Sequence, residues 1–160
     1  MLIRRRIMRL AGGVVAGLSV GLVVACVPAD PIQDPISLTV LDGIPTFAWC
    51  GATTAPKNYM KIDYRTFDPD SQITTSAKGT GAYVLSRGEQ FSIADPPGEL
   101  TMVVENEIPT TYGSIRLFLA AGASEKSIST LASFDVDDLA DLEGGRWLQA
   151  SGTVTESPCG

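Results

Sequence analysis

An Asp-Gly pair between two alternating runs constrains the fold of this chain more than any other feature. Asp42-Gly43 separates Ile36–Leu41 from Ile44–Trp49, and a two-residue Asp-Gly loop favours a tight antiparallel hairpin. With Leu41 opposite Ile44, bulky apolar side chains gather on one face, and a slip of one residue would exchange the two faces. The hairpin is predicted to carry Ile36, Leu38, Val40, Phe47 and Trp49 on one face and Ser37, Thr39, Thr46 and Ala48 on the other.

Alternation of apolar and polar residues predicts further short strands along the chain. In Tyr59–Phe67, Met60 and Ile62 share one face while Lys61 and Asp63 share the other. The other predicted strands are Tyr83–Leu85, Phe91–Ile93, Leu100–Val104, Ile115–Leu119, Ile128–Val136 and Trp147–Val154. About seven to nine short strands at this spacing indicate an all-β protein built as a β-sandwich.

Two shorter segments refine this expectation. Asp137–Glu143 has helical character, with early aspartates and a stop at Gly144-Gly145, so one helical turn is predicted near 137–143. Leu85–Phe91 resembles the corner loops of immunoglobulin-like domains, which implies an immunoglobulin-like sandwich. The chain departs from the immunoglobulin pattern where Trp49 directly precedes Cys50 instead of lying between two cysteines.

The N-terminal segment has the pattern of an export signal. Four arginines precede the uncharged run Leu10–Ala25, whose sixteen residues are fewer than the roughly 20 that a spanning helix needs. The run ends in Val23-Val24-Ala25 followed by Cys26, which resembles the lipobox of bacterial lipoproteins. The resemblance implies cleavage after Ala25, diacylglycerol on the Cys26 sulfur, and a mature protein outside the cytoplasm. It divides the chain into a signal peptide (1–25), a proline-rich tether (26–35) and a folded domain (36–160).

Three points about this segment stay open. The alternatives to a lipobox are a plain signal peptide or an uncleaved anchor with an incidental cysteine. Arg4-Arg5-Arg6-Ile7-Met8 fits a loose twin-arginine pattern as well as an ordinary basic region. A start at Met8 in place of Met1 would remove the triple arginine.

The charge of the mature chain restricts its partners. Four of the twelve basic residues and none of the eighteen acidic ones precede Cys26, which leaves eight and eighteen and a formal charge of −10. Phosphate binding needs clustered Lys and Arg, so nucleic acid is not an expected partner. The expected partners are the membrane, through lipid on Cys26, and another protein or polymer of the cell envelope.

The number of cysteines agrees with the lipobox resemblance. With Cys26 assigned to lipid, Cys50 and Cys159 are left as one possible pair in an oxidising compartment. No CxxC motif is present and the sequence has no histidine, so the usual zinc ligand sets cannot form. We therefore predict a structural Cys50–Cys159 disulfide.

No residue pattern indicates an enzyme or a cofactor. Without histidine, Ser-His-Asp and Cys-His catalysis are excluded, and the carboxylates are scattered through turns. The strand aromatics are expected in the core: Phe47, Trp49, Tyr83, Phe91, Phe118 and Trp147. As speculative sites, we consider a binding surface of Tyr59, Tyr64 and Tyr112, and calcium ligands at Asp135, Asp137, Asp138 and Asp141, although their spacing does not match an EF-hand.

The predicted function is a non-catalytic binding or accessory module of the cell envelope, exported and held on the extracytoplasmic side of the membrane by lipid. The alternatives are an envelope enzyme that works through carboxylates and a calcium-binding surface protein. A pair of facing carboxylates would favour the enzyme, and six to eight converging oxygen ligands would favour calcium.

Overall fold

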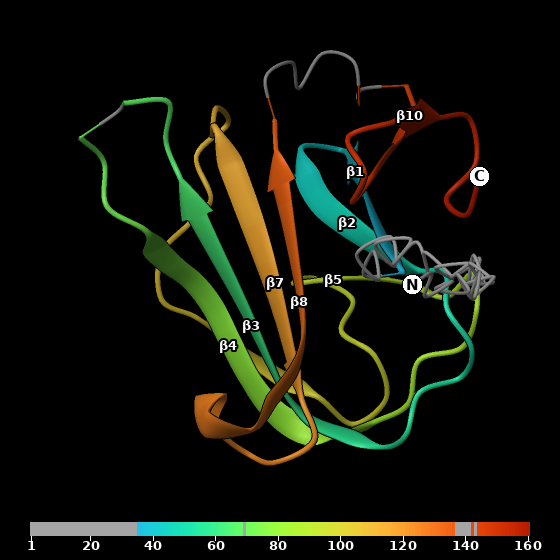
Figure 1. The fold of residues 1–160 in the computed structure, drawn as a ribbon. Helices are drawn as coiled ribbons and strands as arrows, with labels where there is room; N and C mark the ends of the chain where they lie inside the picture. The colour runs from blue at the N-terminus through green and yellow to red at the C-terminus, as the bar shows by residue number, and fades with distance from the viewer. Residues whose placement is uncertain (1–34, 69, 137–141, 143) are drawn as a thin grey trace, which may run out of the picture.

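The computed structural model describes residues 35–68, 70–136, 142 and 144–160. Its ten strands form two antiparallel sheets that face each other (Figure 1). Sheet A has the strand order β10-β9-β1-β2-β5 and sheet B the order β6-β4-β3-β7-β8. The strands are β1 (Ile36–Leu41), β2 (Ile44–Trp49), β3 (Lys57–Arg65), β4 (Thr74–Tyr83), β5 (Gln90–Ser92), β6 (Thr101–Val104), β7 (Ser114–Ala120), β8 (Ile128–Asp135), β9 (Trp147–Gln149) and β10 (Val154–Thr155). The prediction of an all-β sandwich is confirmed, with ten strands instead of seven to nine.

The β1–β2 hairpin has the predicted turn and register. Leu41 pairs with Ile44, Leu38 with Phe47 and Ile36 with Trp49. Asp42 and Gly43 both have positive φ, at 52° and 79°, as the tight turn between right-twisted strands requires. Local sequence alone was sufficient to specify this unit.

The core lies between the two sheets and draws on both. The Phe47 ring of β2 stacks on Phe91 of β5, with 5.9 Å between ring centroids, and lies 6.3 Å from Phe134 of β8. Of the six aromatics expected in the core, two lie elsewhere. Trp147 is buried on the outer face of sheet A, because Leu148 takes the inward position of β9. Phe118 is half-buried, on the outer face of sheet B. The alternation of β7 gives the reason, because its neighbours Leu117 and Leu119 take the inward positions and are fully buried.

Strand β4 was mostly missed by the sequence pattern. Only Tyr83 of this ten-residue strand lay in a predicted strand, because Thr74–Ala82 is rich in small residues and contains two glycines. The two glycines let β6 and the residues just before it approach closely. A Cβ at Gly79 would lie 2.7 Å from the Thr101 carbonyl oxygen, and one at Gly81, whose φ is +141°, would lie 2.3 Å from that of Glu99.

The segment Leu85–Phe91 connects the two sheets. It leaves β4 in sheet B and enters β5 in sheet A, so the strands on either side of Arg87-Gly88 belong to different sheets. Thr54 fastens the start of this corner, since its backbone N–H donates to the Leu85 carbonyl (2.9 Å) and its hydroxyl accepts from the Leu85 N–H (3.0 Å). The corner therefore carries the chain across the edge of the sandwich.

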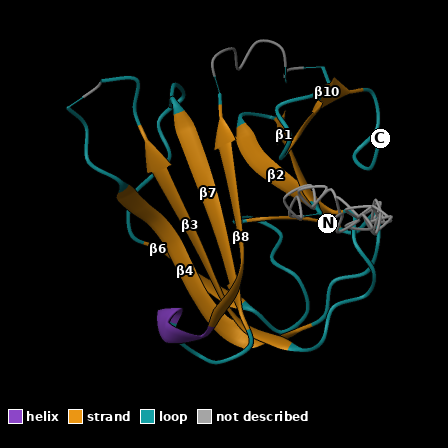
Figure 2. Ribbon diagram, in the orientation of Figure 1, coloured by secondary structure: helices purple, strands orange, loops and turns teal. Residues whose placement is uncertain are grey.

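The last third of the chain differs from the sequence prediction in its strands. The predicted single strand Trp147–Val154 is wrong: β9 and β10 form a hairpin, with Leu148 opposite Val154 and Gly152 in the turn at φ 83°. Apart from Leu142, the helical turn predicted near 137–143 lies outside the described residues. A 3-10 turn that was not predicted, η1 (Glu125–Ser127), joins β7 to β8 (Figure 2).

Candidate functional site

A cluster of charged and aromatic side chains lies on the outer face of sheet B. Because side chains alternate along a strand, Tyr59, Lys61 and Asp63 of β3 point away from the core filled by Met60 and Ile62. In register, Lys61 lies between Lys78 of β4 and Phe118 of β7. We call Tyr59, Lys61, Asp63, Phe118 and Glu125 the Lys61 cluster.

Lys61 is the centre of this cluster. Its Nζ lies 3.1 Å from Asp63 Oδ2 and 3.3 Å from Glu125 Oε1, and it stands 4.8 Å above the Phe118 ring centroid. The lysine side chain is only 12% exposed and that of Asp63 only 6%. Charged hydrogen bonds and the ring quadrupole thus hold one ammonium group in a fixed place on a sheet face.

The 3-10 turn η1 completes the cluster from a distant part of the sequence. It brings Glu125 over the start of β3, where Glu125 Oε1 also accepts a hydrogen bond from the Tyr59 hydroxyl (3.2 Å). The contact spans sixty-six residues of sequence. This packing explains why Tyr59 is 5% exposed although it lies on an outer face.

The ionisation of the cluster follows from these contacts. Burial lowers the pKa of Lys61, but its hydrogen bonds and ion pairs with Asp63 and Glu125 outweigh burial and raise the pKa above 10.5. Burial, together with the charge and hydrogen bond of Glu125, raises the pKa of Tyr59 to about 12. Both groups therefore keep their protons at neutral pH. A lysine or tyrosine base needs a lowered pKa, so this arrangement suits fixed charge display more than proton transfer.

One oxygen in the cluster has no partner among the described residues. Asp63 Oδ1 is buried without a hydrogen bond, and a buried polar atom in this state costs about 1–3 kcal/mol. The register with β4 shifts next to this carboxylate, because Ile62 pairs with Ala77 and Asp63 with Thr75, which leaves Ser76 as an extra residue on β4. The chain thus keeps a carboxylate here at a cost to stability.

Apolar side chains border the Lys61 cluster on both sides. Val103 on β6 pairs with Lys78 and is 58% exposed, and Leu131 on β8 pairs with Phe118 and is 44% exposed. A single cross-strand row therefore runs over all five strands of sheet B, with lysines in the middle and exposed aliphatic residues at its ends. Such a mixture of exposed apolar and fixed charged groups is suited to contact with another macromolecule.

The structure does not bring the three predicted tyrosines together. Tyr59 belongs to the Lys61 cluster, whereas Tyr64 packs half-buried against the core. Tyr112 is 3% exposed and burial raises its pKa. The prediction of a shared tyrosine surface is therefore wrong for Tyr112, because its loop folds inward and its ring fills the core. Sequence reasoning could have found Lys61 and Asp63 as an opposite-charge pair two residues apart, but not Glu125.

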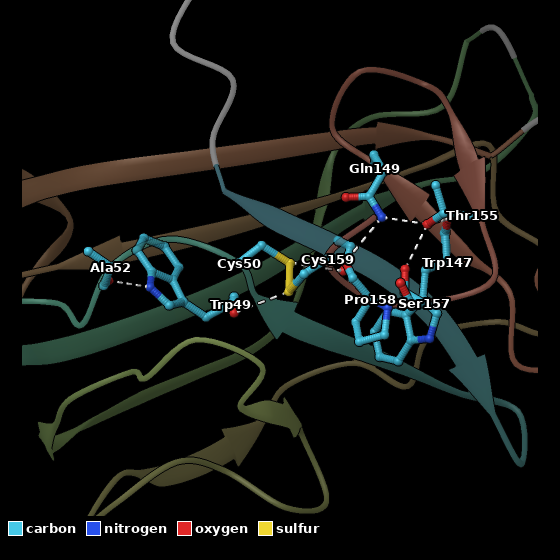
Figure 3. Close-up of a disulfide and its surroundings, with 10 residues drawn as sticks. Trp49, Cys50, Ala52, Trp147, Gln149, Thr155, Ser157, Pro158 and Cys159 are labelled. Carbon is cyan, nitrogen blue, oxygen red and sulfur yellow. Dashed lines mark hydrogen bonds between the residues drawn. A yellow bond between two sulfur atoms is a disulfide. The ribbon is translucent and has the colours of Figure 1, made fainter.

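The disulfide between Cys50 and Cys159 is present, with 5.2 Å between the two Cα atoms (Figure 3). It ties the residue after β2 to the segment that follows β10. Gln149 holds the same segment, since its Nε2 donates to the Pro158 carbonyl (3.1 Å) and to Thr155 Oγ1 (2.8 Å). Because Gln149 pairs with Ser37 on β1, this segment covers the face of sheet A that turns away from the core.

The remaining predicted sites are only partly within the structure. Cys26 and the calcium candidates Asp137, Asp138 and Asp141 lie outside the described residues, and Asp135 is exposed at the end of β8. Within the described ranges, no group of three or more Asp, Glu or Cys is placed to hold a metal ion. The same ranges contain no helix long and apolar enough to cross a membrane.

Comparison with protein-family models, with curated proteins and with solved structures finds no match for this chain.

Proposed function

We propose that this chain is an exported lipoprotein whose β-sandwich is a non-catalytic binding module of the cell envelope. Lipid on Cys26 would hold it at the membrane. The ten residues from Cys26 to Pro35, at about 3 Å per residue in an extended proline-rich segment, would keep the domain within roughly 30 Å of the bilayer. The module would bind a partner protein through the outer face of sheet B.

The observation that carries the binding surface is the fixed position of Lys61. An exposed lysine on a sheet normally keeps its rotamer freedom, whose loss costs up to about 2 kcal/mol on contact. Here Asp63, Glu125 and Phe118 already hold the ammonium group, so little further entropy is lost when a partner docks. Preorganisation of this kind favours binding.

The chemistry of the face indicates the kind of partner. Val103 and Leu131 offer exposed aliphatic contacts at the two ends of the cross-strand row, and the Glu125 side chain is 56% exposed. With a formal charge of −10 for residues 26–160, the domain would attract basic surfaces. The proposed partner is therefore an envelope protein that presents apolar and basic side chains.

The anchor is tested by Cys26→Ala. We expect the wild-type protein in the membrane fraction with an acylated N-terminus by mass spectrometry, and the variant in the soluble fraction without lipid. A variant that stays on the membrane, together with a wild type that carries no lipid, would show that the lipobox interpretation is wrong.

The binding face is tested by a photo-crosslinking amino acid in the native membrane. Placed at Val103, it should yield one reproducible adduct with another protein, whereas at Leu41, which is 40% exposed on sheet A, it should not. Lys61→Met keeps the aliphatic stem over Phe118 and should reduce the adduct at Val103. Lys78→Met, which removes an ion pair with Glu105 instead, should reduce it less. Equal adducts from Val103 and Leu41, or none from either, would contradict the proposed face.

A further inference from the structure

Strand β8 leaves one edge of sheet B open. It pairs with β7 on one side, and no described strand pairs with its other side. Figure 2 shows it as the last long strand beyond β7. At eight residues it is far longer than β5 and β10, the edge strands of sheet A, which have three and two. A long free edge presents unpaired N–H and C=O groups in the spacing that another strand would need.

This edge lacks the usual protection against pairing. Residues 128–134 contain no charge, no proline and no glycine, and Leu131 and Ile128 are 44% and 37% exposed. Lys57 donates to Ser129 Oγ (2.6 Å), but it is only 9% exposed and so does not project beyond the strand. Charged residues, proline or short length normally block edge-to-edge association.

The opposite edge of the same sheet is shorter and is flanked by acidic residues, although Val103 and Val104 are exposed on it. Strand β6 has four residues, and Glu105 follows it directly in an ion pair with Lys78 (2.5 Å). Glu99 and Glu107 stand close to its two ends in sequence. Two acidic copies of this chain would repel each other at β6, whereas the middle of β8 is neutral.

The ends of β8 carry opposite charges. Lys126 lies just before the strand and Asp135 at its end, and neither forms an ion pair within the described part of the chain. The neighbouring Glu125 is already engaged by Lys61. When two copies of one strand pair antiparallel, the start of each meets the end of the other. Lys126 of each copy would then approach Asp135 of its partner.

We propose that β8 pairs antiparallel with β8 of a second copy of this chain, across a twofold axis near Leu131, so that two sheets B form one continuous sheet. The surface is self-complementary, as a twofold interface requires: a neutral middle between ends of opposite charge. Pairing at this edge leaves the outer face of sheet B open. The proposed β8–β8 pairing is therefore independent of the lipid on Cys26 and of the Lys61 cluster.

Disulfide trapping tests the pairing in the full-length protein. Leu131→Cys lies at the proposed axis, and mild oxidation should link it to its own copy as a dimer band on a non-reducing gel. Val103→Cys, 58% exposed on β6, is the matched control and should not form this band, nor should the wild type. Equal dimer formation by both variants, or none by Leu131→Cys, would overturn the proposal.

Charge exchange tests the ends of the strand. Lys126→Asp and Asp135→Lys should each weaken the dimer about fivefold, since two symmetry-related exposed ion pairs are lost. The double variant should restore the wild-type dissociation constant, measured by analytical ultracentrifugation in detergent. A wild type that is monomeric at tens of micromolar, or a double variant weaker than both single variants, would contradict the proposal.

Discussion

The two sheets of this sandwich use their outward faces differently. In sheet A the polar face is buried as well as the apolar one: Ser37 and Thr39 are fully buried, and Thr39 Oγ1 donates to the Arg146 carbonyl (2.7 Å). In sheet B the outward face is open and carries the Lys61 cluster between exposed Val103 and Leu131. The outward face of sheet A is covered by the C-terminal segment that the disulfide holds. The outward face of sheet B remains available for contact.

The difference is physical in origin. Ser37, Thr39 and Ala48 are small, so the segment that ends at Cys159 can lie over sheet A. Tyr59, Lys61 and Phe118 are large and reach outward from sheet B, where the short turn η1 brings Glu125 against Tyr59. Sheet A therefore contributes mainly to stability, and sheet B is where an interaction surface can be kept.

Loss of the disulfide should affect stability most. The double variant Cys50→Ala, Cys159→Ala opens a loop of 109 residues and should lower the free energy of unfolding by about 4 kcal/mol in the chain-entropy model. Urea titration of wild type and variant gives this value. If sheet A depends on its covering segment, hydrogen exchange should rise at β1 and β9 more than at β3 and β7. A uniform rise would remove the proposed difference between the sheets.

Two glycine substitutions probe how each sheet depends on close backbone approach. Gly81→Ala should lower the free energy of unfolding by about 3 kcal/mol. The φ angle of Gly81 is +141°, and the new Cβ would overlap the Glu99 carbonyl oxygen. Gly43→Ala is the matched control in sheet A. Gly43 also has positive φ, +79°, but nothing lies within 4 Å of the added carbon. The expected loss of unfolding free energy is therefore about 1 kcal/mol. An equal fall of the melting temperature in the two variants would mean that the close approach of Glu99 to Gly81 contributes little.

The smallest effect is expected from the Lys61 cluster, and it depends on pH. The folded-state pKa of Tyr59 is raised from 10.0 to about 12, so its contribution is complete below pH 10 and is lost as pH rises toward 12. The pKa of Lys61 is also raised, and its contribution declines above pH 10.5.

The melting temperature measured from pH 9 to pH 12 should therefore fall less steeply for Tyr59→Phe than for wild type. Glu125→Gln should lie between the two, because it keeps an acceptor for the Tyr59 hydroxyl but removes the negative charge. Identical slopes for all three proteins would indicate that the Tyr59–Glu125 contact is not maintained in solution.

Sequence reasoning succeeded where the pattern was local. The Asp42-Gly43 turn and the alternation around it predicted the full β1–β2 register, and strands β3, β7 and β8 were found from their alternation. It failed where a neighbour decided the outcome. Thr74–Ala82 became part of β4 because β6 packs against its glycines, and Tyr112 is buried because its loop folds inward.

The candidate site shows the same limit. The alternation in β3 put Lys61 and Asp63 on the outward face, but nothing in the sequence related them to Glu125 in η1. That contact depends on how the chain after β7 turns back over β3.

By itself, the sequence determined the all-β class, the first hairpin with its register, and a matched pair of cysteines once Cys26 was set aside. Tertiary structure alone decided which outward face was covered, how Lys61 was fixed, and which strand was left with a free edge. The reason is range: turn preference and alternation act over a few residues, whereas covering, ion pairing and edge position depend on segments that only folding brings together.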